Sequence, residues 1–368
     1  MIKAEAFNMN QARVRRLIER AITTFELDLK GLVVLTEAAT GYYALTPLLA
    51  AMGGADKVLA LARDSSYGTA QEARWQTLNV IQQWGFERHI SVLMSREDDR
   101  IGEADIVTNL GAVRPLNASF LRRLKSTSVI PLMWETWEYR PEDLDLATCR
   151  RLGIPVLGTN EHHPDLQILH YVGLLAIKLL FELQIEVFRS EIVVIGGREF
   201  GTQVARTLQS AGAEVTQVRV SEGESLHMSR DREVLMTCDA VVVAEHRSRE
   251  MLIGPGGQME ASELVRLNPG VVVAHIAGAV DRTSLVEAGM ACLPEHIAPA
   301  GYMSVTADRL GPRPLIDLHA AGLKVGEALA QAATRGLRGL DAERYVVAHC
   351  ELAQGWSEHT DLHARAAG

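Results

Sequence analysis

Short apolar runs alternate with longer stretches of helical periodicity along most of the chain. In the first half the runs are rich in β-branched residues and fall at 31–37, 57–63, 90–96, 104–111, 128–135 and 154–161. A second series falls at 191–197, 213–220, 239–246, 270–278 and 290–296. Strands separated by helices are typical of parallel sheets with crossover connections. The pattern therefore predicts an α/β protein built from two doubly wound parallel sheets.

Helical spacing of apolar residues marks three further stretches, at 10–27, 164–188 and 315–335. The first predicts an amphipathic lead-in helix, and the second, the longest apolar stretch, predicts a buried helix between two lobes. The third predicts a helix that returns to the first lobe, ahead of a polar tail. We therefore expect a first lobe at 1–162, completed by 310–368, and a second lobe at 163–309.

Composition narrows the class of protein. A chain of 368 residues with 47% hydrophobic and 23% charged residues fits two folded domains. Its net charge of −9 provides no positive field for a polyphosphate backbone, so no nucleic-acid partner is expected. The sequence shows no signal peptide and no apolar run long enough for a membrane span, which predicts a cytoplasmic protein without a membrane partner.

The four cysteines are far apart in the sequence and form no C-x-x-C pair. This spacing favours reduced thiols over a disulfide framework or a zinc site, and no metal is expected.

The sharpest motif follows the run 191–195, where Gly196-Gly197-Arg198-Glu199-Phe200-Gly201 leads into a helical stretch. This is the context of the G-x-G-x-x-G dinucleotide fingerprint, in which a phosphate binds at the N-terminus of the helix. Gly196 would permit the tight turn, and Gly201 would let the helix pack close to the strand. Arg198 replaces the middle glycine. Either Gly197 supplies the close approach in a shifted turn, or Arg198 contacts the phosphate, or Arg198 blocks the cofactor.

The next strand ends in Val218-Arg219-Val220-Ser221, where an acidic residue would bind the ribose of NAD. Arg219 and Ser221 suit a 2′-phosphate instead, which favours NADP over NAD. We also assign Glu245, His246 and Ala277 to the cofactor site, because they lie at the ends of neighbouring strands.

Residues 143–149, 153–156 and 159–160, together with 267–273, 280–281 and 284–288, resemble the D-isomer-specific 2-hydroxyacid dehydrogenases of the formate/glycerate dehydrogenase-like superfamily. The similarity extends over about residues 104 to 300. It implies a flavodoxin-like substrate lobe, a Rossmann dinucleotide-binding lobe and an active site in the cleft between them. It also implies a nicotinamide cofactor, a small-molecule substrate and a homodimer.

The family's catalysis uses an arginine that binds the substrate carboxylate, a histidine that exchanges a proton, and an acid that tunes the histidine. The arginine is absent, because the matching segment is His275-Ile276-Ala277-Gly278. The segment Pro294-Glu295-His296-Ile297-Ala298 is similar to the family's histidine segment, so His296 is the expected proton-transfer residue. His275 is its rival. Glu295 or Glu245 would serve as the acid.

The substrate loops also depart from the family. Residues 133–140, Met-Trp-Glu-Thr-Trp-Glu-Tyr-Arg, stand where a glycine-rich loop would bind a small carboxylate. Their indoles and carboxylates favour a larger or cationic, amine-bearing substrate, unless the tryptophans simply pack and the carboxylates are solvated. The loop 109–114 also follows a strand, where open sheets place ligands. The expected substrate residues are Asn109, Gly111, Arg114, Glu135, Trp137, Glu138 and Arg140.

Two classes of function remain open at this point. One is an atypical NAD(P)-dependent oxidoreductase that acts on CH–OH or CH–NH groups. The other is a fold retained without redox turnover, either as a ligand-binding or regulatory protein or as a non-redox enzyme such as a lyase or hydrolase.

Overall fold

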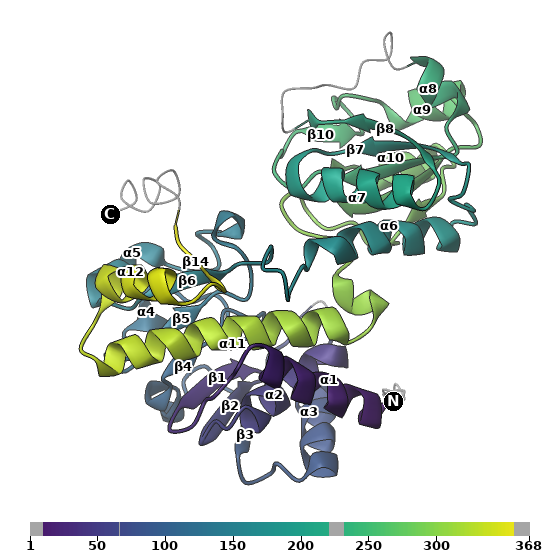
Figure 1. Cartoon of the computed structure of the whole chain (residues 1–368). Coiled ribbons are helices and arrows are strands. Elements are labelled where there is room, and N and C mark those ends of the chain that lie inside the picture. Colours follow the sequence, from purple (N-terminus) through teal and green to yellow (C-terminus); the bar gives the residue numbers. More distant parts are fainter. Residues whose placement is uncertain (1–9, 66, 221–231, 357–368) are drawn as a thin grey trace. The chain divides into compact units, whose positions relative to one another are not determined.

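The structure, a computed structural model, describes residues 10–65, 67–220 and 232–356. These residues form two compact units (Figure 1). The first contains the described residues up to Gln167 and those from Pro312 onward, and the second spans Ile168–Gly311. The sequence alone placed these divisions after residues 162 and 309.

The first unit is built from the following elements: α1 (Gln11–Thr24), β1 (Val33–Glu37), η1 (Gly41–Leu45), α2 (Thr46–Met52), β2 (Lys57–Leu61), α3 (Ala70–Trp84), β3 (Ile90–Leu93), η2 (Asp99–Glu103), β4 (Ile106–Val107), α4 (Ala118–Leu121), β5 (Ile130–Pro131), η3 (Thr136–Glu138), α5 (Leu146–Leu152), β6 (Val156–Thr159), α11 (Arg313–Thr334), α12 (Gly339–His349) and β14 (Ala353–Gln354).

Parallel strands form the centre of this unit in the order β3-β2-β1-β4. An isolated bridge between Ile106 and Val129 connects β4 to the segment leading into β5, which pairs in parallel with β6. The order of the strands therefore reverses between β1 and β4. Such a point is where open α/β sheets bind ligands.

The helices α1, α2 and α11 pack together on this unit, and α11 contacts β4, β5 and β6. Figure 1 shows α11 as the longest helix of the unit, running across the sheet. A second apolar cluster joins strand residues such as Leu35 and Leu59 to Ile101, Phe120 and Cys149 from η2, α4 and α5. The sheet is thus covered on both faces, as parallel sheets require.

The C-terminal segment holds more structure than the polar tail expected from the sequence. Residues 339–349 form α12, and β14 pairs antiparallel with β6. Glu343 of α12 is buried and accepts hydrogen bonds from Arg150 and from the Val156 N–H, the latter at 2.8 Å. The helix is amphipathic only weakly, so these long-range contacts, and not its own periodicity, place it on the sheet.

The second unit is built from α6 (Leu169–Glu182), β7 (Glu191–Ile195), α7 (Arg198–Ser210), β8 (Glu214–Val218), α8 (Arg232–Thr237), β9 (Ala240–Ala244), β10 (Met251–Ile253), α9 (Ala261–Leu267), β11 (Val272–Ala277), β12 (Ala279–Val280), α10 (Arg282–Glu287), β13 (Cys292–Leu293) and η5 (Ala307–Leu310).

Its main sheet is entirely parallel, in the order β13-β11-β9-β7-β8. The chain enters at β7, continues to β8 on one side, and then crosses to β9 on the other side. The carboxyl ends of β7 and β9 therefore form the reversal point of this unit. Both parallel sheets and the doubly wound fold class predicted from the sequence are confirmed.

The long apolar stretch at 164–188 forms a shorter helix than its periodicity suggests, because α6 ends at Glu182. Leu174 and Phe181 on α6 are 44% and 58% exposed, so the expectation of a fully buried helix is wrong for this face. The opposite face packs against α7.

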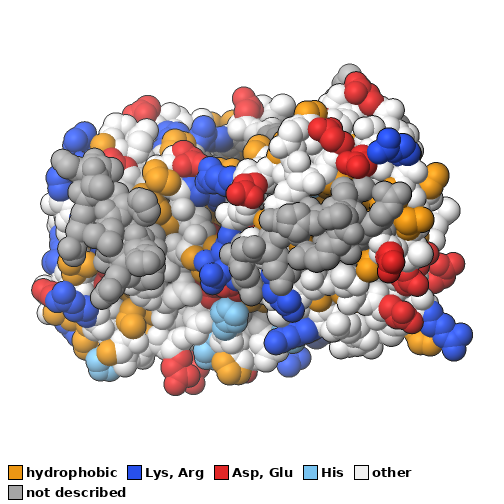
Figure 2. Space-filling view, turned by 90° about the horizontal axis from the view of Figure 1, so that it is seen from above, with side chains coloured by type: hydrophobic (Ala, Val, Ile, Leu, Met, Phe, Trp, Pro, Cys, Tyr) orange, Lys and Arg blue, Asp and Glu red, His pale blue; other side chains and the backbone are white. Residues whose placement is uncertain are grey.

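No helix within the described ranges is long and apolar enough to cross a membrane. Acidic and basic side chains both occur on the face that Figure 2 shows.

Replacing Glu343 with alanine should lower the free energy of unfolding by about 3 kcal/mol, because the change leaves a buried guanidinium and the Val156 N–H without their acceptor. Urea denaturation followed by circular dichroism measures this loss. Asp341→Ala on the same helix removes an exposed acid and should change the value by less than about 0.5 kcal/mol. Equal losses in the two variants would contradict the role given to Glu343.

Candidate cofactor and substrate sites

The glycine-containing turn of the fingerprint lies between β7 and α7. Gly196 has a φ of +150°, and a Cβ there would lie 2.2 Å from the Ala244 carbonyl oxygen at the end of β9. A Cβ at Gly201 would lie 2.1 Å from the carbonyl carbon of Gly196. Neither position has room for a side chain, so α7 packs directly against the turn, as the first and third glycines of the fingerprint do.

Arg198 is the first residue of α7 and has a φ of +43°, in the left-handed region. The residue before it, Gly197, is extended, with φ −120° and ψ −162°. A left-handed conformation favours glycine and is uncommon for arginine. The position of the fingerprint's middle glycine therefore keeps a backbone suited to glycine although its residue is arginine.

Glu199, in the first turn of α7, binds two side chains that follow β9. Its carboxylate lies 2.7 Å from Arg247 Nη2, 3.2 Å from Arg247 Nε and 3.0 Å from His246 Nε2. Burial alone would raise the pKa of Glu199, but hydrogen bonds from His246, from its own backbone N–H and from Arg247 lower that pKa to about 2. The carboxylate is therefore ionised throughout the neutral range.

Other predicted cofactor residues support this network. The Phe200 ring lies 4.3 Å from the His246 ring. Glu245 is fully buried and accepts hydrogen bonds from the N–H groups of Arg247, at 2.9 Å, and Ser248, at 3.0 Å. Glu245 thus shapes the loop after β9. Arg247 is absent from the sequence-based set, although a basic residue directly after a strand of the series was a usable signal.

Arg219 follows β8 directly and is partly exposed. Gln217 of β8 donates a hydrogen bond from Nε2 to the Gly196 carbonyl oxygen at 2.9 Å, which holds the end of this strand beside the turn. Ser221, the second residue expected near the adenosine end, lies outside the described residues.

The proposed proton-transfer residues lie on different strands. His296 and Glu295 are exposed in the loop after β13, and neither makes a hydrogen bond or ion pair within the described ranges. His275 on β11 is fully buried with Nε2 3.0 Å from the Gly278 carbonyl oxygen, and burial lowers its pKa to about 4. Ala277 ends β11, and its carbonyl oxygen accepts a hydrogen bond from the Glu245 N–H at 3.0 Å. His275 is therefore a neutral histidine of the sheet interior.

In the first unit, the loop after β4 lies against Glu37 at the end of β1. Glu37 accepts a hydrogen bond from the Ala112 N–H at 3.0 Å, and a Cβ at Gly111 would lie 3.4 Å from Glu37 Oε2. Burial raises the pKa of Glu37 to about 7, despite this hydrogen bond and the charge of Arg114. Glu37 was missed from the sequence, although it ends a predicted strand at the same edge as the 109–114 loop.

Arg114 and Arg140 converge on one acid. Arg114 Nη1 lies 2.7 Å from Asp143 Oδ2, and Arg140 Nη1 lies 3.4 Å from the same atom. Both guanidinium groups lie over the Trp134 ring, at 4.9 Å and 5.9 Å from its centre. Asp143 and Trp134 thus position the two arginines expected in the substrate site. The sequence did not indicate that Asp143 would take up both charges.

Three carboxyl groups gather after β5 and β6. Glu135 accepts hydrogen bonds from Trp137 Nε1 at 2.5 Å and from the Glu161 N–H at 3.2 Å. Burial is the main cause that raises the pKa of Glu138 to about 7, and burial together with Glu138 and Glu135 raises the pKa of Glu161 well above its usual value. The carboxylates of this loop are therefore shielded from water.

Three buried donor atoms of the same loops have no hydrogen-bond partner within the described part of the chain: Asn109 Nδ2, Arg114 Nε and Trp134 Nε1. The other end of the Asn109 amide accepts from the Met133 N–H at 2.8 Å, so its orientation is fixed. Buried donors normally have acceptors. This edge thus combines unsatisfied donors with acids that resist ionisation, an arrangement suited to a polar ligand with both acceptor oxygens and a positive charge.

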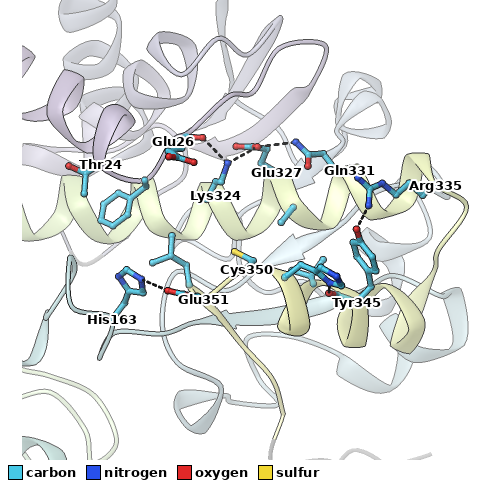
Figure 3. Close-up of a pocket in the computed structure, with 15 residues that line it drawn as sticks. Thr24, Glu26, His163, Lys324, Glu327, Gln331, Arg335, Tyr345, Cys350 and Glu351 are labelled. Carbon is cyan, nitrogen blue, oxygen red and sulfur yellow. Dashed lines mark hydrogen bonds and ion pairs between the residues drawn. The ribbon is translucent and has the colours of Figure 1, made fainter.

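A cavity of about 480 Å³ lies in the first unit between the end of α1, α11 and α12 (Figure 3). It shares no residue with the expected substrate set. Lys324 donates to the Glu26 carbonyl oxygen at 2.7 Å and to Glu327 at 2.8 Å, and Gln331 donates to Glu327 at 3.0 Å. Its polar side chains thus largely satisfy one another. No group of three metal-ligating side chains occurs among the described residues.

Glu37 makes stability depend on pH. Because its pKa is raised in the folded protein, the folded state binds a proton more tightly than the unfolded chain, and the free energy of unfolding falls as pH rises from about 4.5 to about 7. Glu37→Gln lacks this penalty. Relative to the natural protein, the variant should gain on the order of 2–3 kcal/mol between about pH 5 and about pH 8.

Urea unfolding at the two pH values measures that gain. Glu72→Gln is the control, since the pKa of Glu72 is lowered by hydrogen bonds from Thr69 and its effect should not change over this interval. A Glu37→Gln effect that is the same at both pH values would show that the carboxyl is ionised throughout.

No protein-family model matches the sequence, and a comparison with curated proteins finds no match. Among solved structures, the chain is similar to the dipicolinate synthase A chain from Bacillus subtilis, with 13% identity, a TM-score of 0.51, and coverage of 84% of this chain and 99% of that chain. The corresponding subunit from Bacillus halodurans gives 12%, 0.47, 84% and 99%. A structure titled as the pyruvate reductase of Chlamydomonas reinhardtii gives 13%, 0.49, 82% and 97%.

At these identities the likeness concerns the fold. The chain has the two-domain α/β dehydrogenase fold, which is the fold expected from its resemblance to the D-isomer-specific 2-hydroxyacid dehydrogenases.

Proposed function

We propose that the chain is an NAD(P)-dependent oxidoreductase that transfers hydride to or from a CH–OH or CH–NH carbon of a small polar substrate. The observation that carries this proposal is the Gly196–Gly197 turn between β7 and α7, at the point where the strand order of the second unit reverses. Dinucleotides bind to open α/β sheets at such a turn. The fold shared with the dipicolinate synthase A chain is consistent with this assignment.

NADP is the preferred cofactor in this proposal. Arg219 stands after β8, where NAD-binding sheets carry an acid for the ribose hydroxyls. A guanidinium there favours a 2′-phosphate, because it pairs with phosphate oxygens through two N–H groups. Gly196, Gly197 and Gly201 would form the turn beside the diphosphate.

The substrate would bind at the carboxyl edge of the first unit. Asn109, Arg114 and Trp134 offer donors to acceptor oxygens, while Glu37 and Glu138 would ionise beside an ammonium group and bind it. This supports an amine-bearing polar substrate. His296 remains the proposed proton-exchange residue of the second unit, and Glu37, with its pKa near neutrality, is a second candidate in the first unit. We also propose a homodimer, which sedimentation would test.

A second candidate function is a fold that binds a ligand without redox turnover, or a non-redox enzyme. The specific observation in its favour is that Glu199 already binds Arg247 and His246 beside the turn, while Arg198 replaces the middle glycine. In that case the natural protein would bind neither nicotinamide dinucleotide.

Calorimetric titration should show NADPH binding more tightly than NADH. Arg219→Ala should weaken NADPH binding about tenfold and leave NADH nearly unchanged, since only NADPH brings the 2′-phosphate. Arg206→Ala removes an exposed arginine of the same unit from α7 and serves as the charge-matched control. If neither nucleotide binds the natural protein, the oxidoreductase proposal fails.

Arg198→Gly distinguishes the two candidates. Glycine relieves the left-handed strain at this position, so the variant should be at least as stable as the natural protein. If Arg198 contacts the phosphate, the substitution should weaken NADPH binding several-fold. Binding that appears only in the glycine variant would favour the fold without redox turnover.

A further inference from the structure

The contact between Glu199 and the loop after β9 is a two-point ion pair. Two nitrogens of Arg247 face two oxygens of Glu199, at 2.7 Å and 3.2 Å. Because an ionised carboxylate only accepts, His246 Nε2, at 3.0 Å, carries the proton of the third hydrogen bond. The side chains of Glu199, His246 and Arg247 are 20%, 5% and 33% exposed, so the pair is partly shielded from water yet open on one side.

This ion pair spans the reversal point of the second unit. Glu199 follows β7, His246 and Arg247 follow β9, and the two strands are neighbours whose carboxyl ends lie at one edge. The position is the one at which the proposed function places the diphosphate of the dinucleotide. The guanidinium geometry that pairs with two carboxylate oxygens pairs equally well with two phosphate oxygens.

We propose that Arg247 and His246 are the diphosphate-binding residues of the cofactor site, and that Glu199 occupies them until the cofactor displaces it. This inference rests on the proposed function and deepens it. Glu199 is an internal competitor that lowers the affinity for the dinucleotide and for diphosphate alone. On cofactor binding, the hydrogen bonds of both cations transfer from a carboxylate of this chain to the phosphate oxygens.

Glu199→Gln tests the proposal, because it removes the competing charge while keeping the size of the side chain. Calorimetry should show NADPH, and inorganic pyrophosphate as the minimal probe, binding about tenfold more tightly or better than to the natural protein. Glu191→Gln removes the same charge at the amino end of β7 and is the matched control. It should leave both affinities unchanged.

Arg247→Ala supplies the second arm. It should weaken NADPH and pyrophosphate about tenfold, and in the Glu199→Gln background it should abolish the gain, since both residues act through one contact. Melting temperatures of all variants establish that each is folded.

Two results separate the failures. If the natural protein binds NADPH and folded Glu199→Gln binds it no more tightly, the competition is overturned and the proposed function stands. If neither the natural protein nor any variant binds NADPH or NADH, the proposed function fails, and this inference fails with it.

Discussion

The parallel direction of the strands is the constraint on which the rest of this molecule depends. In each main sheet every parallel strand ends at the same edge, so segments distant in sequence meet there. Apolar strand interiors are covered by helices, and polar side chains collect in the loops at the carboxyl ends. Glu37, the 109–114 loop and the 133–140 loop meet in this way in one unit, and the 196–201 turn meets the loop after β9 in the other.

The two edges treat their acids in opposite ways. Hydrogen bonds from two cations and a backbone N–H outweigh burial at Glu199 and keep it ionised, with a pKa of about 2. At Glu37 and Glu138 burial prevails over nearby arginines, and the pKa values rise to about 7. One edge therefore holds a fixed charge pair, whereas the other can exchange protons near neutral pH. The proposed division between a phosphate-binding unit and a substrate-binding unit follows from this contrast.

The sequence predicted the strands well because a buried parallel strand is a continuous apolar run. Each predicted run contains a strand of the structure, from β1 at Val33–Glu37 to β13 at Cys292–Leu293. The Gly196–Gly201 turn was equally readable, since its requirements concern six consecutive residues. The helix α12 was not readable, because its position depends on Glu343 binding Val156, far away in the chain.

The sequence by itself therefore determined the fold class, the positions of the strands and the local form of the dinucleotide turn, all of which arise from short-range patterns. Only the tertiary structure decided which charges meet. Glu199 binds Arg247, Glu37 binds the Ala112 N–H, and Asp143 takes up both Arg114 and Arg140. Periodicity places a residue on a strand or a loop, but the energy of a charge depends on its partners and its burial, which exist only once the sheets have formed.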